Sequence, residues 1–123
     1  MSLRQCRFSE LPDDVQTFLS EMVGCSGTEE LLDRLRRHRF KIRNVPASAF
    51  PAVPVWTDYR DRAYTEEMVG KSLPPAIICG KQWLDGRHRV WAWRRAGREQ
   101  IPCIDLAEIG FSYPFKPVAT LNI

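Results

Sequence analysis

The segment from 73 to 106 constrains the fold most, because Pro and Gly residues divide it into short pieces of distinct type. Two prolines precede the apolar run 76–79, and a Gly-Lys pair separates that run from Gln-Trp-Leu at 82–84. Since two such runs around a two-residue turn form a hairpin, we predict a β-hairpin over 76–84. The breaker-free segment 87–96 predicts a helix, and 101–105 predicts one more buried strand.

Two amphipathic helices are predicted before this segment. Between 9 and 22, four apolar residues recur with helical spacing: Val15, Phe18, Leu19 and Met22. Thr28 begins a second helix, with acidic residues in its first turn and basic residues in its last, as the helix dipole favours. Apolar and polar residues then alternate over 40–45, which predicts a strand with one face in solvent.

These elements predict an α+β fold with a small mixed sheet made from 40–45, the hairpin and 101–105, and with the helix 87–96 packed on that sheet. The chain of 123 residues is shorter than a typical domain of ~150 residues, so we expect one domain. Its parts are a helical N-terminal part (1–39), the sheet-bearing core (40–106) and a C-terminal tail (107–123). A chain this small favours a shallow cleft over an enclosed pocket.

Composition argues against several classes of protein. The first thirty residues contain six acidic side chains and no long apolar stretch, so we expect no signal peptide, no membrane partner and a cytoplasmic location. The four cysteines stand far apart without a CxxC pair, and there are only two histidines, which argues against a metal site of the zinc type. A net charge of +3 permits an anionic ligand.

The string LDGRHRVWAWRRAG gathers chemically useful groups at the start of the predicted helix. Asp85 stands at the N-cap position, and Gly86 lets another backbone or a ligand come close. Arg87, His88 and Arg89 then place cationic side chains beside the N–H groups of the first turn. Such N–H groups and charge-assisted donors suit phosphate oxygens. Spacing alone also allows an ordinary capped helix with solvated arginines.

The motifs PPAII, WLDGRHR and AGREQIPCI resemble the ParB/sulfiredoxin (ParB N-terminal-like) superfamily, over roughly 58–106. Its members share a hairpin, a glycine-containing turn with a His-Arg or Arg-Arg pair at a helix N-terminus, and a following strand. The resemblance implies a ParB/sulfiredoxin-like fold and a nucleotide-binding protein, with ATP, ADP or CTP as ligand and Mg²⁺ as companion ion. It implies phosphate contacts from Gly86, His88 and Arg89, and Asp85 fits a DGxHR variant of the turn.

The sequence departs from two branches of this superfamily. Sulfiredoxins place their nucleophilic cysteine directly before the His-Arg pair, where this chain has Arg87, so we do not expect a sulfiredoxin. ParB clamps continue into a helix-turn-helix domain, whereas this sequence ends seventeen residues beyond Leu106, so we expect the DNA-reading part to be absent. A kinase-like or NTPase-like activity, by phosphoryl transfer or NTP hydrolysis, is the remaining expectation.

The resemblance also suggests catalytic residues outside the turn. A basic residue before the hairpin reaches the nucleotide in relatives, and Lys71 is a candidate, with Arg60, Arg62 and Thr65 as other residues of that segment. A glutamate acts as base in the serine-kinase relatives, and Glu66 and Glu67 are candidates for this role. His88 is the catalytic candidate within the turn. Solvated helix charge is the alternative interpretation of both glutamates.

The basic segment 34–43 supports a second hypothesis, a non-catalytic nucleic-acid-binding or protein-binding module on the same scaffold, of plasmid or phage origin. The candidate residues of this surface are Arg36, Arg37, Arg39 and Lys41. A solvated helix end explains the same charges, because helical spacing spreads them around the axis.

Core packing explains the tryptophans near the turn, and two of the cysteines, as well as a functional role does. Trp83, Trp91 and Trp93 flank it, and one of them could stack on a nucleobase, although packing in the core explains them equally well. Cys79 and Cys103 lie in apolar runs and are expected to be inert core thiols.

Overall fold

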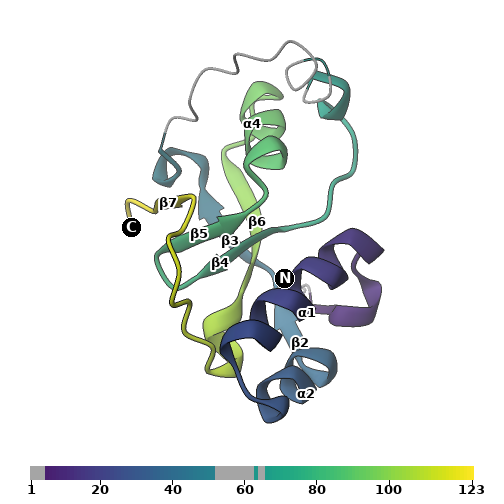
Figure 1. Ribbon diagram of the computed structural model, residues 1–123. Coiled ribbons are helices and arrows are strands. Elements are labelled where there is room, and N and C mark those ends of the chain that lie inside the picture. The colour runs from purple at the N-terminus through teal and green to yellow at the C-terminus, as the bar shows by residue number, and fades with distance from the viewer. Residues whose placement is uncertain (1–4, 52–62, 64–65) are drawn as a thin grey trace.

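The computed structural model describes residues 5–51, 63 and 66–123, and the chain forms an α+β fold with two sheets (Figure 1). The smaller sheet contains β1 (Gln5–Arg7) and β2 (Arg39–Lys41). The larger sheet has the strand order β3-β6-β4-β5-β7. The predicted fold class is therefore confirmed.

The two N-terminal helices are present as α1 (Asp13–Ser26) and α2 (Glu29–Arg37). Thr28 caps α2, because its Oγ1 accepts a hydrogen bond from the backbone N–H of Leu31 at 3.3 Å. Helix α1 runs past Gly24 and ends at the C-cap Gly27. Strand β1 and the short 3-10 helix η1 (Phe8–Glu10) were not predicted. Among the described residues, no helix is long and apolar enough to cross a membrane.

The single strand predicted over 40–45 is wrong, because the chain changes sheets at Ile42. Strand β2 pairs antiparallel with β1, whereas β3 (Arg43–Pro46) pairs antiparallel with β6 (Gln100–Asp105). Phe40 and Val45 are both buried, but in different core clusters. Two exposed residues, Arg43 and Asn44, stand between Ile42 and Val45, so the two-residue alternation fails there.

The predicted hairpin is confirmed as β4 (Ala76–Cys79) and β5 (Gln82–Asp85). Ile77 pairs with Asp85 and Ile78 with Trp83, so Leu84 is an extra residue that forms a β-bulge. Helix α4 (Arg87–Arg95) then crosses over to β6, which pairs parallel with β4. After η3 (Leu106–Ile109), the C-terminal tail returns to the sheet, where β7 (Ala119–Thr120) pairs antiparallel with β5.

The larger sheet has a core cluster on each face. Ile77 and Cys79 pack with residues of α1 and α2, whereas Ala76 and Ile78 pack with Val90 and Trp93 of α4 and with Trp83. All four residues of β4 are buried, which explains the uninterrupted apolar run in the sequence. The burial of Trp83 and Trp93 supports the packing interpretation of these tryptophans. Figure 1 shows α4 above the sheet and the two N-terminal helices below it.

Candidate functional site

Gly86 makes the turn from β5 into α4. Its backbone is left-handed, with φ 99° and ψ 25°, a conformation that glycine adopts without steric cost. A Cβ atom at this position would lie 3.2 Å from both Cα and Cβ of Ala76, in the centre of the sheet. The carbonyl of Gly86 accepts the N–H of Val90 at 2.8 Å, so Gly86 is the N-cap residue. Only glycine lets α4 begin this close to β4.

The prediction that Asp85 caps α4 is wrong. Asp85 is the last residue of β5, where it pairs with Ile77, and α4 has no side-chain cap at Gly86. The Asp85 carboxylate instead accepts a hydrogen bond from Nη2 of Arg89 at 3.2 Å. Because Asp85 pairs within the sheet, it lies one residue before the N-cap position, which Gly86 occupies. Its carboxylate pairs instead with Arg89, four residues later in the chain.

Arg89 is a buried structural residue as well as a member of the predicted turn. Its side chain is 9% exposed. Besides the ion pair with Asp85, Nη1 donates to the carbonyl of Pro75 at 2.6 Å and to that of Pro74 at 3.2 Å. The guanidinium group therefore joins α4 to the chain entering β4, and its charge lies beneath the turn.

A cleft of about 580 Å³ opens over this turn. The structure brings together there five of the six residues predicted to contact the nucleotide, all but Lys71: Asp85, Gly86, Arg87, His88 and Arg89. The opposite walls come from the first turn of α1, which includes Asp14, and from Met68, Leu73 and Val118. This volume lies within the ~300–1,000 Å³ typical of small-molecule sites.

The charges around the cleft suit a polyanion with a divalent cation. The beginnings of both α1 and α4 contribute to its lining, and each carries the positive end of a helix dipole. Arg87 is exposed and His88 is half-buried at the lining. Asp14 and Asp85 supply carboxylates, and Mg²⁺ is commonly held by one or two carboxylates together with substrate phosphates. No sequence pattern pointed to Asp14, which looked like an ordinary acidic residue in the first turn of a helix.

The predicted site residues Glu66, Glu67 and Lys71 do not line the cleft. Glu66 is exposed, and its Oε1 lies 3.9 Å from Nε of Arg95, at the opposite end of α4 from His88. Glu67 and Lys71 are exposed and do not line the cleft, to which their segment contributes Met68 and Leu73 instead. The candidates Arg60, Arg62 and Thr65 lie outside the described residues.

Cys79 and Cys103 are core residues, as predicted. Burial raises the pKa of the Cys103 thiol to about 12, and burial also raises the pKa of Cys79. Both side chains are therefore neutral thiols at physiological pH, which makes them poor nucleophiles. In the part of the chain that the structure describes, no group of three or more His, Cys, Asp and Glu side chains is placed to hold a metal ion.

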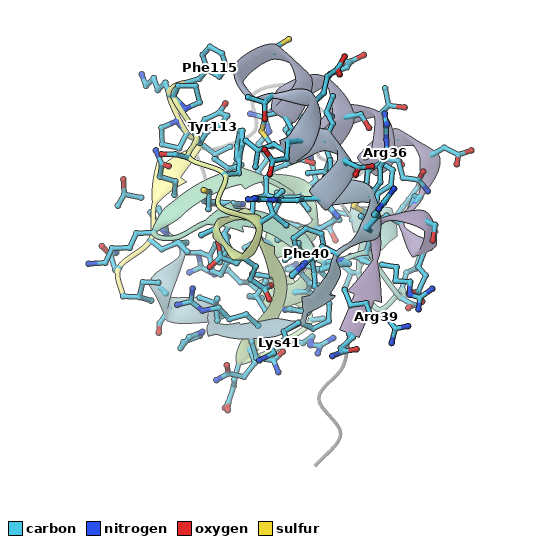
Figure 2. The ribbon with its side chains drawn as sticks, turned by 90° about the horizontal axis from the view of Figure 1, so that it is seen from below. Arg36, Arg39, Phe40, Lys41, Tyr113 and Phe115 are labelled. Atoms are coloured by element: carbon cyan, nitrogen blue, oxygen red, sulfur yellow. The ribbon has the colours of Figure 1, made fainter. Side chains whose placement is uncertain are left out.

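The basic segment 34–43 divides into paired and unpaired cations. Ion pairs join Arg34 to Glu30 at 2.9 Å, Arg37 to Asp33 at 3.4 Å and Arg43 to Asp105 at 3.3 Å. Three cations form no ion pair with a described residue: Arg36, Arg39 and Lys41. In Figure 2, Arg39 and Lys41 lie toward the lower margin of the view, and Arg36 lies higher, at the right. Of the four residues predicted for a partner surface, Arg37 is therefore the one that forms an ion pair with a described residue.

Comparisons with known proteins add no assignment, since no family model, no curated protein and no solved structure matches this chain.

Proposed function

We propose that this chain binds a nucleotide by its phosphates at the start of α4, as ParB/sulfiredoxin-like proteins do. The observation that carries the proposal is the cleft over the turn, where Arg87 and His88 share one lining with Gly86 and the first turn of α1. The first-turn N–H groups of a helix lack acceptors within the helix and point toward its N-terminus, so they suit phosphate oxygens.

Different parts of the cleft would bind different parts of the nucleotide. Arg87 and His88 supply charge-assisted hydrogen bonds, which are about twice as strong as neutral ones. Leu73 and Val118 give an apolar wall that suits a ribose or a base. Arg89, which is held by Asp85 and two proline carbonyls, fixes the position of the turn and adds positive charge beneath it.

The proposed chemistry is phosphoryl transfer or hydrolysis of ATP, ADP or CTP. Mg²⁺, where it binds with the nucleotide, would neutralise phosphate charge, and Asp14 and Asp85 are the carboxylates of the cleft able to hold it. His88 lines the cleft at the start of α4, where a neutral imidazole would accept a proton from an attacking hydroxyl or water. We do not assign the role of base to Glu66, because Glu66 does not line the cleft and lies beside Arg95, at the other end of α4.

Nucleotide binding should raise the melting temperature of the wild-type protein. In a screen of ATP, ADP, CTP and GTP with Mg²⁺, one nucleotide should stabilise the fold by ~2.7 kcal/mol at a hundred times its dissociation constant. The double variant Arg87→Ala/His88→Ala should bind that nucleotide at least ~10-fold more weakly by calorimetry, because it loses two charge-assisted hydrogen bonds. Phosphate release measured on the same samples distinguishes hydrolysis from binding alone.

The matched control is Arg95→Ala/Arg98→Ala, which removes two exposed cations at the other end of α4 and should keep the wild-type affinity. The proposal fails if no nucleotide shifts the wild-type melting temperature. It also fails if the folded Arg87→Ala/His88→Ala protein keeps the full shift.

A further inference from the structure

The outer face of the small sheet carries positive charge only. Alternation along β1 and β2 places Gln5, Arg7, Arg39 and Lys41 on this face, and all four are exposed. Phe40 faces inward and is fully buried. Arg7 lies directly opposite Arg39, and Gln5 opposite Lys41. We call these four residues the ribbon face. In Figure 2, Phe40 lies near the centre of the view, and Arg39 and Lys41 lie toward its lower margin.

This arrangement is unfavourable for the isolated protein. Like charges directly opposite each other in an antiparallel pair are destabilising, and Arg7 and Arg39 occupy such positions. Among the described residues, the three cations of the ribbon face form no ion pair, although their neighbours Arg37 and Arg43 do. The Glu10 carboxylate accepts the backbone N–H of Arg7 at 2.9 Å. A bound polyanion would offset the repulsion between the cations.

We propose that the ribbon face binds the phosphodiester backbone of a nucleic acid. Side chains two residues apart on a strand stand ~6.7 Å apart, and directly opposite residues stand ~5 Å apart, so flexible Arg and Lys side chains on this grid reach neighbouring phosphates. Duplex DNA presents one charge per ~1.7 Å of its axis. The charged side chains of the ribbon face are Arg7, Arg39 and Lys41, and all three donate hydrogen bonds, which phosphate oxygens accept.

The ribbon face fits a nucleic acid better than an acidic protein. Stable protein interfaces need a buried apolar or aromatic centre. The large apolar side chains that the described residues expose are Phe115, Val118 and Ile123, and all three belong to the C-terminal tail. Backbone binding to nucleic acid depends mainly on cations and released counterions, and needs no apolar anchor.

The structure also revises which basic residues take part. Arg37 is paired with Asp33, and Arg36 lines a groove with Asp13 and Glu21, whose carboxylates oppose its charge. Arg39 and Lys41 remain from the residues that the sequence suggested. Arg7 joins them from a strand that the sequence did not predict.

Fluorescence anisotropy with labelled single-stranded and duplex DNA of arbitrary sequence tests the proposal. For three phosphate contacts, the wild-type affinity for duplex should fall ~40-fold between 50 and 200 mM salt. Arg7→Gln/Arg39→Gln/Lys41→Gln should bind at least ~10-fold more weakly at 50 mM salt, with the log–log salt slope reduced by ~2–3. The control Lys81→Gln/Arg98→Gln/Lys116→Gln loses the same charge from exposed positions elsewhere and should stay within ~3-fold of wild type.

Equal weakening of the two triple variants, or no wild-type binding at 50 mM salt, would overturn the proposal. Polyglutamate is the acidic-protein probe. If polyglutamate binds the wild type as tightly as DNA does, and the ribbon-face variant no longer binds it, the face would be assigned to an acidic protein and the nucleic-acid proposal would be overturned. The ribbon-face variant should melt no lower than wild type, and a nucleotide should raise its melting temperature as much as it raises that of wild type. This result separates nucleic-acid binding at the ribbon face from nucleotide binding at the cleft. If the triple variant does not fold, Arg39→Gln and Lys41→Gln singly should each lower the salt slope by ~0.9.

Discussion

Arg89→Ala should destabilise the protein by about 3 kcal/mol before any ligand is added. The substitution removes a buried guanidinium and leaves three acceptors without their donor: the Asp85 carboxylate and the carbonyls of Pro74 and Pro75. It also opens a void between α4 and the chain entering β4. For a chain of this length, the loss corresponds to roughly 12 °C in melting temperature. Urea unfolding followed by circular dichroism measures it.

The control for this prediction is Arg95→Ala, the same change on the same helix. The Arg95 side chain is 63% exposed, and its contact with Glu66 is long at 3.9 Å. Exposed ion pairs contribute little, so this variant should lose no more than ~0.5 kcal/mol. Equal stability of the Arg89→Ala and Arg95→Ala proteins would show that Arg89 does not hold the turn in place.

Gly86→Ala should cost about 2–3 kcal/mol of stability, for two separate reasons. A left-handed backbone costs an L-residue ~1–2 kcal/mol. The new methyl group would also lie 3.2 Å from Cα of Ala76, a fully buried residue of the central strand β4, and 3.2 Å from Nη2 of Arg89. Either the sheet or the Asp85–Arg89 ion pair must shift. The melting temperature should therefore fall by roughly 8–12 °C.

Gly97→Ala separates the two causes. Gly97 also has positive φ, at 82°, but a Cβ atom there meets nothing within 4 Å. Its alanine variant should lose only the backbone term, ~1 kcal/mol. If the two variants lost the same stability in parallel melts, close packing of Gly86 against Ala76 would play no part, and alanine would be tolerated sterically at the start of α4.

Helices and strands were predicted correctly from the sequence where residues close in the chain determine their ends. The hairpin and α4 are each bounded by Pro or Gly, and the apolar run of β4 fits a strand buried on both faces. Thr28 marked the start of α2 through its hydroxyl, a contact spanning only three residues. Residues 85–89, the candidate phosphate site, are neighbours in the chain, so their meeting at one cleft followed from the turn itself.

Long-range pairing explains what the sequence did not show. The alternation over 40–45 carried no sign that β2 would pair with Gln5–Arg7 while β3 paired with Gln100–Asp105. Asp85 looked like an N-cap because capping rules consider only the next few residues, whereas its position was decided by pairing with Ile77. Asp14 reaches the cleft only because α1 packs beside the segment before β4, which no local pattern encodes.

The strand pairing of this fold has a consequence for the order in which the chain folds. The β4–β5 hairpin closes through a two-residue turn, and α4 follows it directly. The pairs Arg43↔Cys103 and Gln5↔Lys41 instead join distant parts of the chain, so their formation requires closing long loops. Because non-local contacts slow folding, β3 and the small sheet should set the refolding rate. The turn at Gly86 should therefore form early, before the first turn of α1 completes the cleft above it.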